Sequence, residues 1–224
     1  MTDNIQNVTL ALRADIATLN TISNNVANAN TPGYRAERSV PTFQSQLDGS
    51  ASSVAIDLQD GPLTVTKGPL DLALRGHGFF QVQHGNQVLL SRAGNFRMDA
   101  DGKLVNANGD RVIGDSGALA LTDTGVRVDA KGEVWSGTRS MGQLSIVDVA
   151  DPAKLTLSEG GFRYDGELTE WKGSVQQGAI EHANVDIAGE TIRLMELTRH
   201  VESVQHAISI YDKAMDTGIN RLGE

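Results

Sequence analysis

Residues 184–222, NVDIAGETIRLMELTRHVESVQHAISIYDKAMDTGINRL, hold the most regular hydrophobic pattern in the chain. Charged residues such as Arg193 and Glu196 fall outside that pattern, and Asp186 is placed to cap a helix start. The apolar positions recur three and four apart, the seam spacing of a helix that packs on another helix, and they predict a helical segment over 178–224. The seam begins with Ile187 one heptad upstream and continues through Leu194, Leu197, Val201, Val204, Ile208, Tyr211, Met215, Gly218 and Leu222.

A second helix is predicted at the other end of the chain, over residues 1–30. Its three–four alternation holds once Asp15 is accepted at a seam position, with Ile16 beside it able to share that role. Asparagine side chains then compete for backbone hydrogen bonds, and Thr31–Pro32–Gly33–Tyr34 fits a type II turn that ends the helix. The apolar seam positions are Ile5, Val8, Leu12, Leu19, Ile22 and Val26.

The middle of the chain has a different pattern. Residues 31–60 are polar and predict a linker, with Gly49–Ser53 as its most flexible part. Residues 61–177 contain short alternating runs, such as Leu70–Arg75 and Val126–Val128, that predict half-buried strands. Asp99–Leu104 and Asp129–Val134 share one hairpin design, in which a Gly takes the positive φ of the turn. The expected class is α+β, with paired coiled-coil-like terminal helices and one all-β domain inserted between them.

Composition excludes several classes of function. The 224 residues carry a formal net charge of −9 and contain no basic cluster, so nucleic acid is not an expected partner. The absence of cysteine excludes disulfides, thiolate catalysis and Cys-ligated zinc. The N-terminus lacks the pattern of a secretory signal, and no stretch approaches the roughly 20 apolar residues of a membrane span. We therefore expect no cleaved signal and no membrane insertion.

Residue types that carry catalysis are present but not in working arrangements. Gly76-His77-Gly78 begins like a dinucleotide loop, yet Gln81 stands where the third Gly is required. Asp99-x-Asp101-Gly102 lacks the ligand spacing and closing Glu of a calcium loop. The five histidines form no i, i+4 metal pair: His77, His84, His182, His200 and His206. We expect no enzymatic activity, no cofactor, no metal and no small-molecule substrate.

Spacing alone leaves two interpretations of the terminal helices open. Each apolar stripe needs a partner, because such a helix is only marginally stable in water. The two helices could pair within one chain, or they could pack on the helices of neighbouring subunits with folding coupled to assembly. For the β domain, a Gly- and Asp-rich adhesin or carbohydrate-binding module is a further alternative.

Four segments carry more specific motifs: Ser23–Tyr34 (SNNVANANTPGY), Gly68–Phe80 (GPLDLALRGHGFF), Ser91–Phe96 with Asp99–Gly102, and Asn184–Asp186. In this order they resemble the rod and hook proteins of the bacterial flagellum. In that family a helix ends in an Asn-rich stretch and a Gly–aromatic turn. The matching N-terminal motif here comprises Asn24, Asn25, Asn28, Asn30, Thr31, Pro32, Gly33 and Tyr34.

The resemblance implies a structural subunit of the basal-body rod, located where the rod crosses the periplasm. It implies export by the flagellar type III apparatus and self-assembly through the terminal helices, which would surround the export channel. The implied partners are copies of the chain, other rod subunits and, in transit, the export apparatus. Chain length and the Leu70–Leu74 segment favour the proximal rod, with the distal rod as the alternative. On this view the two helical seams are the assembly surface.

Overall fold

The computed structural model describes residues 2–40, 53–121 and 125–222. The chain divides into two units: residues 1–26, 39–54 and 186–224 form the first, and residues 27–38 and 55–185 form the second. The first unit consists mainly of helix α1 (Thr2–Asn28) and helix α3 (Ile187–Leu222). The second is built of strands, so the α+β class with a β domain between two terminal helices is confirmed.

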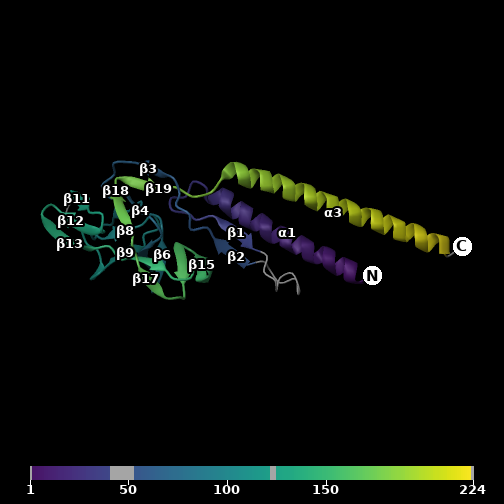
Figure 1. Cartoon of the computed structure of the whole chain (residues 1–224), viewed down its shortest axis with the longest axis horizontal. Coiled ribbons are helices and arrows are strands. Elements are labelled where there is room, and N and C mark those ends of the chain that lie inside the picture. The colour runs from purple at the N-terminus through teal and green to yellow at the C-terminus, as the bar shows by residue number, and fades with distance from the viewer. Residues whose placement is uncertain (1, 41–52, 122–124, 223–224) are drawn as a thin grey trace. The chain divides into compact units, whose positions relative to one another are not determined.

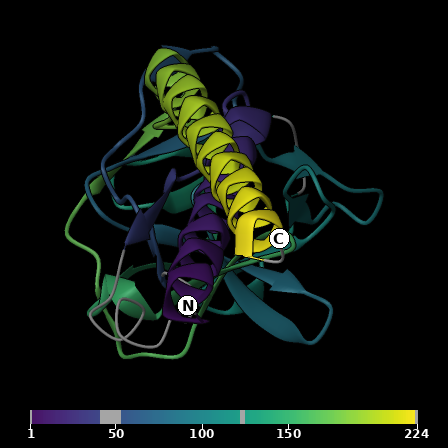
Figure 2. The same ribbon diagram turned by 90° about the vertical axis from the view of Figure 1, so that its right-hand side faces the viewer.

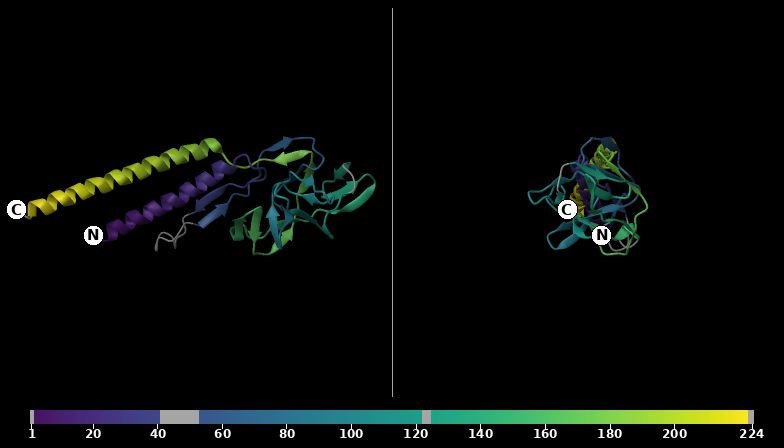
Figure 3. Two further views of the ribbon diagram at one scale, coloured as in Figure 1. Left: turned by 180° about the vertical axis from the view of Figure 1, so that it is seen from behind. Right: turned by 90° about the vertical axis from the view of Figure 1, so that its left-hand side faces the viewer.

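Helices α1 and α3 lie side by side and run in opposite directions (Figures 1, 2 and 3). Two cross-helix contacts define the pairing: Asn25 with Glu190, and Asp15 with His200. α3 begins as predicted after Asp186, whose carbonyl accepts the first helical hydrogen bond from the Glu190 N–H at 2.9 Å. Neither helix of the described residues has the length and apolar character needed to cross a bilayer.

The β unit contains mostly short antiparallel strands. Its largest sheet has ten strands, seven of them in the order β15-β16-β6-β5-β9-β8-β7, while β14 pairs with β5 and β17, and β10 pairs with β9. The bounds are β5 (Phe79–His84), β6 (Gln87–Ser91), β7 (Arg97–Met98), β8 (Leu104–Val105), β9 (Arg111–Gly114), β10 (Gly117–Ala118), β14 (Ile146–Val149), β15 (Leu155–Ser158), β16 (Gly161–Tyr164) and β17 (Leu168–Glu170). A 3-10 turn, η1 (Pro152–Lys154), precedes β15.

Smaller sheets complete the unit. A three-stranded sheet contains β11 (Val126–Val128), β12 (Glu133–Ser136) and β13 (Arg139–Gln143). Two antiparallel pairs join distant parts of the chain: β3 (Leu63–Val65) with β19 (Ala179–Glu181), and β4 (Leu72–Arg75) with β18 (Ser174–Gln177). A further two-stranded sheet is formed by β1 (Glu37–Val40) and β2 (Ser53–Ile56).

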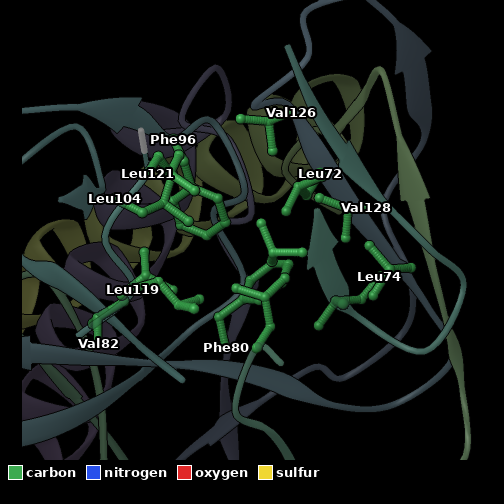
Figure 4. Packing of buried hydrophobic residues seen from close by; sticks show 14 of the residues in the cluster. Leu72, Leu74, Phe80, Val82, Phe96, Leu104, Leu119, Leu121, Val126 and Val128 are labelled. Carbon is green, nitrogen blue, oxygen red and sulfur yellow. The ribbon is translucent and has the colours of Figure 1, made fainter. Parts of the chain in front are cut away.

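Strand β5 contributes to two hydrophobic clusters, because successive residues of a strand point to opposite faces. Phe80 packs in the larger cluster with Leu72, Leu74 and Val82 (Figure 4), where its ring meets Phe96 edge-on at 5.0 Å between centroids. Phe79 packs in the smaller cluster, edge-on to Phe162. β4 is also covered on both sides: Ala73 is buried along with Leu72 and Leu74, so the predicted half-buried alternation is wrong there.

The two predicted hairpin turns are confirmed, and a third of the same kind lies between them. In each five-residue loop the first side chain accepts hydrogen bonds from the backbone N–H groups two and four positions later. The fourth residue is a Gly with φ of +77°, +90° or +85°. These loops connect β7 to β8, β8 to β9 and β11 to β12: Asp99–Lys103, Asn106–Asp110 and Asp129–Glu133.

Two element boundaries differ from the sequence-based expectation. Residues 31–60, expected as a linker, include β1 and β2; most of the expected flexible stretch, residues 49–52, lies outside the described residues, and Ser53 begins β2. Residues 178–186, expected within the C-terminal helical segment, include β19, and α3 starts only at Ile187. Three- and four-residue strands are too short to give a recognisable period, which explains both differences.

Candidate assembly surface

From residue 191 to residue 210 of α3, the predicted seam coincides with the less exposed positions, whereas Ile187 at its start is 48% exposed. Among residues 191–210 every side chain is exposed except Leu194, Leu197, Val201 and Val204. Ile208, the next seam residue, is 38% exposed. Tyr211 and Met215 lie within α3, but their side chains are outside the described residues. The spacing thus identifies the side of α3 that is turned toward α1.

On α1, the covered side departs from the predicted seam toward the end of the helix. Val8 and Leu12 are half-buried and Ile22 is buried, whereas Leu19 and Val26 are 40% and 41% exposed. The side chain of Ile5 is outside the described residues. Asn25 is buried in place of Val26 because its amide donates to the Glu190 carboxylate of α3 at 3.3 Å. The buried residue at this point of α1 is therefore a polar one, which apolar spacing does not identify.

The helix pair leaves an open apolar groove of about 490 Å³. Its apolar lining comes from both helices: Leu12, Ile16 and Leu19 of α1, and Leu197 and Val201 of α3. Asp15, Thr198, Glu202 and Gln205 add polar groups. Within this groove Ile16 is 57% exposed. Exposed apolar side chains that gather in one groove mark a surface that another protein covers.

The N-terminal motif forms the turn that follows α1. Tyr34 N–H donates to the Thr31 carbonyl at 3.2 Å, and Gly33 has φ +68°, so the predicted turn is confirmed. Thr31 also donates to the Asn28 side chain at 3.2 Å. A Cβ on Gly33 would lie 2.3 Å from the Ala93 nitrogen, so only glycine fits against this backbone. Of the other motif residues, Asn24 and Asn30 are exposed and Pro32 is half-buried.

Directly after this turn lies a buried charge cluster that sequence analysis missed. Glu181 accepts from Arg35 Nη1 at 2.9 Å and from Arg92 Nε at 2.6 Å, and Asp60 contacts both arginines. Arg92 also donates to the carbonyls of Leu74, Gly76 and Gly78. Burial lowers the pKa of Arg35 below its ordinary value, while the Glu181 carboxylate opposes that shift.

The cluster holds four chain segments together within the β unit, those around Arg35, Asp60, Arg92 and Glu181. The Asn184 side chain supports it: its oxygen accepts from the Ala36 N–H at 2.6 Å, and its amide donates to the carbonyls of Asp57 and Gln59. Gly33 N–H donates to the Glu181 carbonyl at 2.8 Å. The residues that follow α1 are therefore hydrogen-bonded directly to the residues that precede α3. Arg92 and Asn184 lie in motifs singled out from the sequence, but no spacing pairs them with residues so distant in the chain.

The described residues contain no group of three or more acidic or histidine side chains arranged for a metal ion. Asp99 Oδ1 accepts from the N–H groups of Asp101 and Lys103 within its turn. His84, His182 and His200 each contact one side chain, those of Asp110, Thr64 and Asp15. These contacts stabilise turns and pairs of elements.

Family models match three parts of the chain. "Flagella basal body rod protein" matches residues 5–35, "Flagellar hook protein FlgE/F/G D1 domain" matches residues 73–136, and "Flagellar basal body rod FlgEFG protein C-terminal" matches residues 176–222. The matches thus include α1 with its turn, part of the β unit, and α3.

Individual relatives extend over nearly the full chain. The chain is 31% identical to the flagellar basal-body rod protein FlgF of Caulobacter vibrioides over 225 residues, covering 92% of each protein. It is 26% identical to FlgF of Mesorhizobium japonicum, covering 96% of each. It is also 26% identical to the rod protein FlgG of Bacillus subtilis, covering 90% of this chain and 92% of that one.

Proposed function

The chain belongs to the flagellar basal-body rod protein family, and on that premise we propose that its paired terminal helices pack against other axial subunits to form the wall of the rod. The chain is a structural subunit of the basal-body rod and not an enzyme. Self-assembly through these helices, around the export channel, is the finer function proposed here.

One observation carries the proposal: the groove formed by α1 and α3 exposes apolar side chains from both helices. Burying apolar surface is favourable by about 25 cal/mol per Å². A helix presented by a neighbouring subunit has the shape and the apolar stripe to cover such a groove. The proposed partners are therefore copies of this chain and homologous rod subunits, whose helices pack into the groove that α1 and α3 form together.

Export by the flagellar type III apparatus is part of the same proposal. The cysteine-free chain forms no disulfide that would have to be broken before passage through a narrow channel. In transit the export apparatus is a further partner.

The proximal rod is the proposed location within the basal body. The relatives from Caulobacter vibrioides and Mesorhizobium japonicum, at 31% and 26% identity, are both FlgF proteins. A distal position remains the alternative, because the FlgG protein of Bacillus subtilis is similar over a comparable length. An adhesin or carbohydrate-binding module is no longer supported, since family membership includes both helices and the β unit.

The proposal is tested by replacing Ile16 with Asp. Ile16 is 57% exposed in the free chain, so we expect the thermal stability of the purified protein to change little. In the rod the new charge would lie in an apolar contact, so complementation of a null strain for motility should fail. Ala14→Asp is the matched control, because Ala14 is exposed and lies about 200° around the helix from Ile16. Full motility of the Ile16→Asp strain would overturn the proposal.

A further inference from the structure

Two polar pairs connect α1 with α3. Asn25 Nδ2 donates to Glu190 Oε1 at 3.3 Å, where Asn25 is 1% and Glu190 6% exposed. Farther along α3, His200 Nδ1 lies 3.0 Å from Asp15 Oδ2, where the His200 side chain is 56% and the Asp15 side chain 16% exposed. Glu190 also accepts from Arg193 of its own helix at 3.1 Å.

The two pairs specify one alignment. Ten residues separate Asp15 from Asn25 on α1, and ten separate Glu190 from His200 on α3, in the opposite direction. Both pairs are therefore satisfied by the same antiparallel register. A shift along α3 breaks both together: the buried Asn25 amide loses its hydrogen bond to Glu190, whose Oε1 then keeps only the bond from Arg193 of its own helix.

Apolar residues alone do not select one register of α1 against α3. The α3 seam repeats at heptad spacing from Leu194 to Ile208, so a displacement by seven residues again sets apolar side chains against α1. Related axial proteins share the same kind of C-terminal helix, which offers foreign partners with a similar stripe. Polar groups placed in a seam select one register and one partner by penalising the others.

We propose that Asn25–Glu190 and Asp15–His200 form a register lock, which makes α1 pair with the α3 of its own chain in one alignment. The lock concerns pairing within the chain and is independent of whether the groove then packs into the rod. It assigns to Asn25, a residue of the N-terminal motif, a role in partner selection.

Disulfide trapping in the purified full-length chain tests the lock, because the natural sequence has no cysteine. Thr18→Cys with Leu197→Cys reports the native register, since each lies three residues from the Asp15–His200 pair toward the Asn25–Glu190 pair. Thr18→Cys with Val204→Cys reports displacement by one heptad. In a glutathione buffer we expect the native pair to oxidise at least about tenfold more than the displaced pair.

Replacing both members of the buried pair, Asn25→Leu with Glu190→Leu, should reduce that ratio toward one or produce disulfide-linked dimers. The control Asn20→Leu with Glu196→Leu makes the same exchange at exposed positions and should leave the ratio unchanged. A ratio that stays near tenfold in the Asn25/Glu190 variant would overturn the lock. Motility plays no part in this readout, so the outcome is separate from that of the rod proposal.

If circular dichroism shows that the Leu variant has lost helical content, two charge-changing variants test the same proposal. Asn25→Glu sets a second carboxylate against Glu190 and should favour the displaced register. Adding Glu190→Asn exchanges the two groups and should restore the native preference. Failure of the exchange to restore the ratio would contradict the proposal.

Discussion

Arg92 Nε lies 2.6 Å from Glu181 Oε2, and both side chains are only 1% exposed. Because removing one partner of a buried pair leaves an uncompensated charge, we expect Glu181→Ala to lower the free energy of unfolding by about 3–5 kcal/mol. Urea denaturation followed by tryptophan fluorescence measures this, since both tryptophans, Trp135 and Trp171, lie in the β unit. The control Glu167→Ala, at an exposed site, should change the free energy of unfolding little. A loss below about 1 kcal/mol for Glu181→Ala would show that the cluster is not structural.

Replacing Gly33 or Gly109 distinguishes the energetic cost of backbone strain from the cost of a steric clash. Both have positive φ, +68° and +90°, but a Cβ on Gly33 meets the Ala93 nitrogen at 2.3 Å, whereas one on Gly109 meets nothing within 4 Å. Gly109→Ala should cost about 1–2 kcal/mol from backbone strain alone. Gly33→Ala should cost clearly more, because the turn after α1 must also move. Equal urea midpoints for the two variants would mean that the close approach at Gly33 carries no penalty.

Asp57 gives the β unit a defined acid sensitivity. Burial by itself raises the pKa of this carboxyl. Hydrogen bonds from the Gln59 N–H and from Arg38 lower the pKa by more, so that in the folded protein it lies below its ordinary value of 3.8. The resulting stabilisation is present above that ordinary value and is lost as the pH falls through the lower folded pKa. We expect Asp57→Asn to lower the urea midpoint at about pH 6 and to flatten its decline at acid pH. An unchanged decline would contradict this assignment.

The sequence predicts the helical parts well because their periodicity extends over many turns. Between residues 191 and 210 of α3, the positions that spacing selects, Leu194, Leu197, Val201 and Val204, are the ones that are not exposed. Leu19 and Val26 are exposed instead, while Asn25 is buried beside Glu190, its hydrogen-bond partner 165 residues away. No local pattern contains that information.

The β unit was predictable in class but not in its connections. The Asp99 and Asp129 loops were recognisable from their residues, and the Asn106–Asp110 loop carries the same Asp/Asn-Ala-x-Gly pattern, which could have identified it. The Arg35–Glu181–Arg92 cluster had no such signal. Its members lie on segments that meet only after β3 pairs with β19 and β4 with β18.

Labelling of a single cysteine at Ile16 tests the central claim most directly. The chain contains no other cysteine, so Ile16→Cys gives one reactive site, and Ala14→Cys serves as the reference. In the free protein both should react rapidly with a maleimide, because both positions are exposed. In purified basal bodies we expect Ile16→Cys to react at least about tenfold more slowly, since a neighbouring helix covers the groove. Equal reactivity of Ile16→Cys in the free protein and in the rod would contradict assembly through this surface.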